Sequence, residues 1–125
     1  METKLDWVAG QAESMVESAE RNIALFAGKL TDNPAYSMAW ADSVFSSAAD
    51  LELGKQILKL IEVFKTKDLA DNDIVAHLRT TIQDQINCSA RRAANKSTSM
   101  SSNYMDDCRM AANAKVIEWL QVPVE

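Results

Sequence analysis

The side chains best suited to chemistry in this sequence are one histidine and two cysteines. His77 follows Asp73 by four residues, which would place both on one face of a helix. A metal site needs further ligands, and neither the His-Glu-x-x-His motif nor the Glu-x-x-His pairs of di-iron bundles occurs in the sequence. Cys88 and Cys108 lie too far apart for a paired-cysteine zinc site. We therefore expect no metal site and no cofactor, and we expect His77 at the surface or at the edge of the core.

Motifs that carry other kinds of chemistry are also missing from the sequence. The three glycines are scattered singly, so no loop can cradle a phosphate, and the Gly-x-Ser-x-Gly turn of hydrolases does not occur. The segment DLADND, residues 68–73, lacks the glycine and the terminal glutamate of a calcium-binding loop. A Cys–His dyad of His77 with either cysteine stays open, but nothing in the sequence favours it. We predict that the protein has no catalytic residues and is not an enzyme.

Composition indicates which elements would have to position any site. The chain has 125 residues, of which 47% are hydrophobic and 25% are charged, as in an ordinary globular domain. All-β domains need more turns than the few helix breakers could supply, and these breakers are Gly10, Gly28, Gly54, Pro34 and Pro123. The expected fold is therefore all-α, a single-domain bundle of four or five helices that spans residues 1–125.

No segment of the sequence predicts secretion or insertion into a membrane. The N-terminal segment METKLDWVAGQAES begins polar and has no apolar core of the kind found in signal peptides. No apolar run approaches the roughly 18 residues that span a bilayer. Two cysteines are too few for a disulfide framework. We therefore expect no membrane association and a cytoplasmic location.

Apolar periodicity and capping residues predict where the helices lie. Larger apolar residues recur in steps of three or four, as in amphipathic helices. Asn33 and Pro34 suit the start of the second helix, which is either one long helix or two helices broken near Asp50–Gly54. Gly54 is expected to be a kink or a contact point. The apolar stripes cover residues 5–30, 34–66, 72–95 and 105–119.

The serine-rich segment KSTSMSSNYMDD, residues 96–107, separates the last two stripes. Asn103 followed three residues later by Asp106 resembles a capping box, which would place Asp106 and Asp107 in the first turn of the last helix. We interpret the serines as an ordered connection whose hydroxyls bond to nearby backbone. The alternative is a hydroxyl-rich loop that holds a phosphate or an acidic partner, formed by Arg91, Arg92, Lys96, Ser97 and Ser99.

Charge is distributed unevenly along the chain. Residues 1–78 carry 7 basic and 13 acidic side chains, a net charge of −6, whereas the rest of the chain carries 6 and 5, a net charge of +1. Residues 85–105 contain three basic side chains, Arg91, Arg92 and Lys96, and no carboxylate. This basic island is either a solvated helix C-terminus, where cations suit the helix dipole, or a small phosphate-contacting patch.

Exposed acidic and aromatic side chains suggest protein binding. Trp7 lies one position off the first apolar stripe, so we expect it to be exposed, and aromatic residues often anchor protein interfaces. An acidic face could bind a partner by charge complementarity, and it would be formed by Glu13, Glu17, Glu20, Asp42, Asp50 and Glu52. The alternative is that these carboxylates only form a solvated face. A long second helix with few capping signals could also pack across a homodimer.

Two segments resemble a known group of proteins. The first segment, residues 33–62, has an Asn-Pro pair before Tyr36 and Trp40, and the second, residues 97–120, contains Ser-Thr-Ser, Ser-Asn and Met105. Both are similar to small uncharacterised helical proteins of plasmids, phages and bacterial mobile regions. The two segments cover less than half of the chain. This resemblance implies a mobile-element setting, in which small acidic proteins bind and block a host protein. We predict a non-enzymatic protein-binding module, most concretely an anti-CRISPR-like inhibitor of a bacterial defence complex.

The alternative prediction is a nucleic-acid-associated accessory factor for plasmid or phage maintenance. It would contact phosphates through basic residues, and its affinity would fall steeply as salt is added. The residues concerned are Arg91, Arg92, Lys96, Arg109 and Lys115.

Overall fold

The protein is an all-α bundle, as the sequence predicts. The computed structural model describes residues 3–32, 37–94 and 100–121, and these residues form four helices and no strand. Within them, no helix has the length and apolar character needed to cross a membrane. The helices are α1 (Lys4–Asp32), α2 (Ser37–Thr66), α3 (Asp71–Ala94) and α4 (Met100–Gln121).

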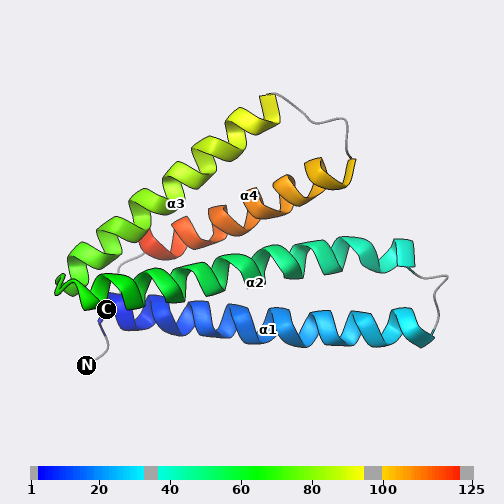
Figure 1. Cartoon of the computed structure of the whole chain (residues 1–125), viewed down its shortest axis with the longest axis horizontal. Helices are drawn as coiled ribbons and strands as arrows, with labels where there is room; N and C mark the ends of the chain where they lie inside the picture. The colour runs from blue at the N-terminus through cyan, green and yellow to red at the C-terminus, as the bar shows by residue number, and fades with distance from the viewer. Residues whose placement is uncertain (1–2, 33–36, 95–99, 122–125) are drawn as a thin grey trace.

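The four helices form two antiparallel pairs that meet at one end of the molecule. Figure 1 shows α1 and α2 side by side along the long axis, whereas α3 rises away from the end of α2 and α4 returns between α3 and α2. The pairs lie close together near the start of α1 and the end of α4, and they spread apart toward the opposite end. The helices α2 and α3 each pack against the other three helices.

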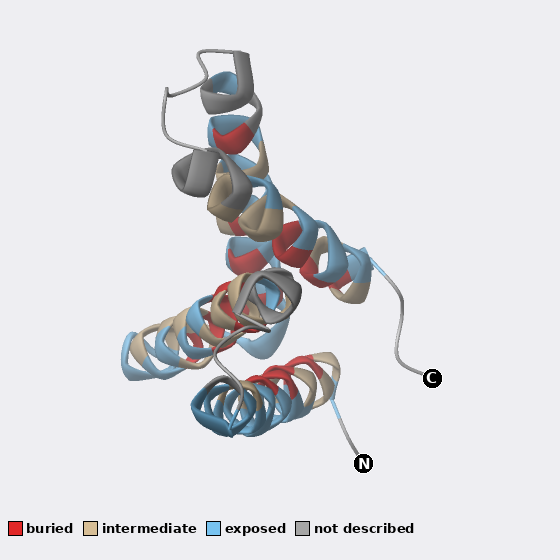
Figure 2. Cartoon of the chain, turned by 90° about the vertical axis from the view of Figure 1, so that its right-hand side faces the viewer, coloured by how far each residue is buried: buried red, intermediate tan, exposed pale blue. Residues whose placement is uncertain are grey.

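The core lies where the two pairs meet. Figure 2 shows the buried residues on the sides of the helices that face one another. Each helix contributes residues spaced three or four apart, which is the amphipathic pattern of a helix packed on one side. The buried apolar residues include Leu5, Val8, Ala12, Met15, Ala49, Leu53, Ile57, Ile61, Ile74, Leu78, Ile82, Ala112, Val116 and Leu120.

The second helix is continuous, which decides between the two alternatives left open by the sequence. Gly54 is buried within α2 and causes no break. A Cβ atom at this position would lie 2.7 Å from Val16 Cγ2 and 3.2 Å from the carbonyl oxygen of Ala12, both in α1. The missing side chain therefore lets the backbones of α1 and α2 approach closely, so Gly54 is a contact point and not a kink.

The start of the last helix corrects the predicted capping box. Because α4 begins at Met100, Asn103 lies inside the helix and cannot be its N-cap, and the first turn contains no acidic residue. Asp106 lies further along and pairs with Arg109 one turn later. Serine has only a modest penalty in helices, and tertiary packing contributes more to helix stability than local propensity does. The preceding residues, 95–99, lie outside the described part of the chain.

Two cations from other helices cap the C-terminal end of α4. Lys4 Nζ donates a hydrogen bond to the carbonyl oxygen of Trp119 at 2.6 Å, and Arg79 Nη2 donates one to the carbonyl oxygen of Leu120 at 2.6 Å. These are among the carbonyls that a helix end leaves without an intrahelical partner, and the helix dipole favours positive charge there. Burial, followed by the nearby charge of Arg79, lowers the pKa of Lys4.

Trp7 is less exposed than the sequence predicts. Trp7 is half-buried and packs against the core, and Lys4 Nζ lies 4.9 Å from the centre of its ring. The expected exposure was wrong, because a residue next to an apolar stripe can still pack against the edge of the core. Trp119 is also half-buried against the core. The side chain of Trp40 lies outside the described residues.

Candidate functional site

A groove of about 680 Å³ opens where the two helix pairs begin to separate. Its volume falls within the range typical of small-molecule and side-chain binding sites. One wall comes from α2, one from α3 and one from α4. The lining residues are Ala49, Glu52, Leu53 and Gln56 of α2, Thr81, Asp84, Gln85, Cys88 and Ser89 of α3, and Arg109 and Asn113 of α4.

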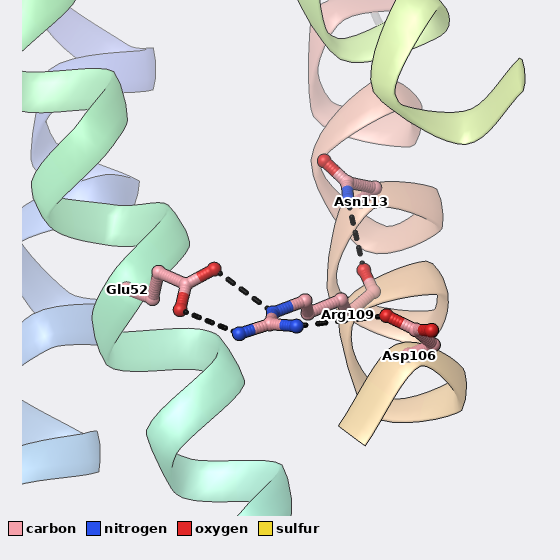
Figure 3. A network of polar contacts seen from close by, with 4 residues as sticks. All are labelled: Glu52, Asp106, Arg109 and Asn113. Carbon is pink, nitrogen blue, oxygen red and sulfur yellow. Dashed lines mark hydrogen bonds and ion pairs between the residues drawn. The ribbon is translucent and has the colours of Figure 1, made fainter. Parts of the chain in front are cut away.

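Arg109 ties α4 to α2 at the side of this groove. Its Nε lies 3.1 Å from Glu52 Oε1 and its Nη2 lies 3.3 Å from Glu52 Oε2, so the two side chains pair through two parallel hydrogen bonds (Figure 3). Its Nη1 lies 3.5 Å from Asp106 Oδ1. The hydrogen bonds that Arg109 donates to Glu52 are the main cause that raises the pKa of Arg109, and burial opposes them. The guanidinium therefore stays positively charged and is already matched by two carboxylates.

A second ion pair joins the same two helices. Lys115 Nζ lies 3.4 Å from Asp50 Oδ2. Because the side chains of both pairs are partly exposed, each pair contributes only about 0–1 kcal/mol to stability. Both pairs link α4 to α2, and Glu52 and Arg109 of the first pair also line the groove.

Asn113 is the buried polar residue of the groove. Its side chain is 5% exposed, and its Nδ2 donates a hydrogen bond to the carbonyl oxygen of Arg109 at 2.9 Å. This bond fixes which way the amide points. The other atom, Oδ1, is buried and has no hydrogen-bond partner among the described residues. Figure 3 shows this oxygen turned away from Arg109, on the side of α4 that faces α2. A buried acceptor without a partner costs about 1–3 kcal/mol, and so native structures contain few of them.

The charge of the groove is slightly negative. Glu52 and Asp84 contribute two carboxylates to the lining and Arg109 contributes one cation, which gives a net charge of −1. Asp84 is exposed and forms no ion pair with the described residues. Ser89 is a buried residue of the α3 wall. Leu53 adds an apolar surface beside these polar groups.

The predicted acidic face is divided between two surfaces. Glu13, Glu17 and Glu20 are exposed on α1, and none of them has a hydrogen bond or ion pair within the described part of the chain. Asp50 and Glu52 instead face α4, where Lys115 and Arg109 neutralise them. The side chain of Asp42 lies outside the described residues.

The basic island falls largely outside what the structure describes. Arg91 is exposed on α3. The side chain of Arg92 and the residues Lys96, Ser97 and Ser99 lie outside the described part. The two remaining cations of the nucleic-acid alternative, Arg109 and Lys115, are already paired with carboxylates of α2.

The histidine and cysteines do not form a common site. His77 is exposed and stacks on Phe64, with the ring centres 5.2 Å apart. Cys88 is exposed and Cys108 is half-buried, and neither forms a disulfide within the described part of the chain. Among the described residues, no group of three or more potential ligands could hold a metal ion.

The groove itself could not be recognised in the sequence, because its polar residues come from three helices. One signal was present for Asn113, which directly follows the apolar position Ala112 and precedes Val116 by three residues. A polar residue at the edge of an apolar stripe is a candidate for partial burial. Comparisons with models of protein families, with curated proteins and with solved structures find no match to this chain.

Proposed function

We propose that the protein is a non-enzymatic binding module that attaches to a basic surface of another protein through the outer face of α1. The observation that supports this proposal is the stripe formed by Glu13, Glu17 and Glu20. These carboxylates are exposed and have no partner within the described residues. Their spacing of four and three residues keeps them on one side of the helix.

Electrostatics favours such an attachment. The three carboxylates lie within about 10 Å along the helix axis, given a rise of about 1.5 Å per residue. They concentrate negative charge on a chain whose net charge is already −5. Complementary charge increases the rate of association and the selectivity more than it increases affinity. Because exposed charges are screened by salt, the attachment should weaken as ionic strength rises.

The more concrete form of the proposal is an inhibitor of a bacterial defence complex such as a CRISPR effector. It rests on the resemblance of residues 33–62 and 97–120 to proteins of plasmids, phages and mobile regions. An acidic helix could occupy a channel that normally holds nucleic acid, because such channels are lined with basic residues.

The test compares two triple variants that lose the same total charge. The first, E13Q/E17Q/E20Q, neutralises the stripe on α1. The control, E62Q/D107N/E118Q, neutralises three exposed carboxylates on α2 and α4. DNA cleavage by a panel of purified CRISPR effectors is measured with each protein. A tagged pull-down from nuclease-treated bacterial lysate tests the broader proposal.

We expect the wild-type protein and the control to inhibit one effector, or to retain one stoichiometric protein partner, and the α1 variant to lose this effect. Equal loss in both variants would show that only net charge matters and would contradict attachment through α1. Full activity of the α1 variant would contradict it as well. A partner that is captured without inhibition of any effector would refute the concrete form and leave the binding module supported.

A further inference from the structure

The buried Oδ1 of Asn113 accepts no hydrogen bond from the described residues. Because Nδ2 is held by the carbonyl oxygen of Arg109, the amide cannot exchange its two ends without losing that bond. The acceptor therefore stays at a fixed place beneath the groove between α2, α3 and α4. A ligand that donates an N–H group to Oδ1 would satisfy it.

The charges around the groove select the kind of donor. The Arg109 guanidinium is matched by Glu52 and Asp106, which leaves the Asp84 carboxylate without a countercharge among the described residues. An anion would meet this carboxylate, whereas a cation would neutralise it. The apolar surface of Leu53 suits an alkyl chain attached to the cation. Guanidinium is less strongly hydrated than ammonium and presents several N–H donors in one plane, so it is the better match for a partly buried acceptor.

We propose that this groove binds an alkyl guanidinium group, which donates to Asn113 Oδ1 and lies beside the Asp84 carboxylate. The oxygen is covered in the unbound structure, so a lining side chain has to move before the ligand reaches it. The groove does not include the α1 stripe. This binding is therefore independent of the attachment through Glu13, Glu17 and Glu20.

The experiment is a titration followed by amide chemical shifts in a ¹⁵N-labelled full-length chain. The first probe is butylguanidinium, and its matched control is butylurea, which has the same shape and no charge. The second pair is a blocked Ala-Arg-Ala tripeptide and the same tripeptide with citrulline in place of arginine. We expect both guanidinium probes to shift the backbone signals of Gln85 and Arg109 and the side-chain amide of Asn113 in a saturable way.

The two probes distinguish the sources of the guanidinium. Tighter binding of the tripeptide would assign the groove to an arginine side chain of a protein partner. Equal or weaker binding of the tripeptide would assign it to a free small molecule. The proposal is overturned if neither probe gives saturable shifts in the groove up to about 10 mM, an affinity weaker than about 3 kcal/mol of binding free energy. Equal shifts with butylurea or the citrulline peptide would overturn it too.

Three variants test the named contacts. We expect N113L to weaken butylguanidinium binding about tenfold, because the acceptor is removed, and D84N to weaken it about threefold, because a rim charge is removed. The control D107N removes an exposed carboxylate outside the groove and should bind as the wild type does. Wild-type affinity in both N113L and D84N would refute the site, and circular dichroism checks that N113L is folded.

The same variants separate this proposal from the proposed function. E13Q/E17Q/E20Q should bind butylguanidinium normally, whereas D84N should retain the effect assigned to the α1 stripe. If the α1 variant loses butylguanidinium binding, the groove is not an independent site and the inference fails.

Discussion

At the scale of single residues, we expect Asn113 to lower the stability of the bundle in which it is buried. It gains one hydrogen bond, from Nδ2 to the carbonyl oxygen of Arg109, and leaves Oδ1 without a partner among the described residues. A typical hydrogen bond contributes about 1 kcal/mol, whereas a buried acceptor without a partner costs about 1–3 kcal/mol. The balance is unfavourable, which is expected where a residue serves a site and not the core.

Replacing Asn113 with leucine should therefore stabilise the protein. Leucine has a similar volume and no polar atom, and the Arg109 carbonyl lies within α4, where the helical backbone supplies a donor. We expect the free energy of unfolding to rise by about 1 kcal/mol in urea titrations followed by circular dichroism. The control N22L changes an exposed asparagine of α1 and should alter stability by no more than about 0.5 kcal/mol. A lower stability of N113L would mean that Oδ1 is satisfied in solution.

Exposure of single residues could be predicted from the sequence at the centre of each apolar stripe and on the face opposite to it. Glu13, Glu17 and Glu20 are exposed as their spacing indicated. The prediction that Trp7 is exposed was wrong, because the exposure of a residue at the edge of a stripe depends on which neighbour packs beside it. The pairing of Glu52 with Arg109 joins residues 57 positions apart, and helical periodicity contains no information on such contacts.

At the scale of helices, the contact between α1 and α2 depends on Gly54. Glycine normally costs about 1 kcal/mol relative to alanine inside a helix. Here it permits an approach in which a Cβ atom would lie 2.7 Å from Val16 Cγ2 and 3.2 Å from the Ala12 carbonyl oxygen. A methyl group cannot fit unless the two helices separate slightly, and overpacking of this kind costs about 1–3 kcal/mol.

We expect G54A to destabilise the protein even though alanine is the better helix former. The net loss should be about 1 kcal/mol, since the overpacking exceeds the gain in helix propensity. The controls G10A and G28A introduce a methyl group with no atom within 4 Å and should each raise stability by about 0.5–1 kcal/mol. The double variant V16A/G54A should lose less than the sum of the two single variants, because the nearest obstructing atom is gone. Thermal unfolding measures G54A, V16A, V16A/G54A and the two controls against the wild type, and a G54A variant as stable as G10A would contradict the close approach.

The helices themselves were largely predictable, and their ends less so. Long apolar stripes gave the first three helices to within a few residues, because periodicity averages over many turns. The predicted start of α4 was wrong because a cap is identified from only a few residues. The pair Asn103 and Asp106 fits a cap as well as it fits a helix interior. Whether α2 was broken at Gly54 depended on the neighbouring helix, which the sequence does not specify.

At the scale of the whole molecule, the two helix pairs are held together mainly at one end. The deepest residues of α1 are Leu5, Val8 and Ala12. Further along the same stripe, Ile23 and Phe26 are only half-buried, and the neighbouring Leu25 is 54% exposed. Periodicity indicates which side of a helix is apolar, but it does not tell whether another element covers that side. The sequence therefore could not predict that α3 and α4 turn away from this part of the hairpin.

This arrangement predicts a gradient of local stability along α1. Backbone amides between residues 5 and 19 lie over the core and should exchange with solvent only on global unfolding. Those between residues 20 and 32 have few buried contacts, so they should exchange through local opening, with free energies of opening several kcal/mol below the global value. Native-state hydrogen exchange measured by NMR at low protein concentration checks this prediction.

Uniform protection along α1 would contradict the gradient and would mean that another surface covers the far half of the hairpin. A second copy of the chain would do this, because Leu25 and the half-buried Ile23 and Phe26 offer an apolar surface. Protection of residues 20–32 would then rise with protein concentration, and L25E would abolish the rise. If protection of these residues is low and does not change with protein concentration, the far half of the hairpin is uncovered in solution, as it is in the single chain.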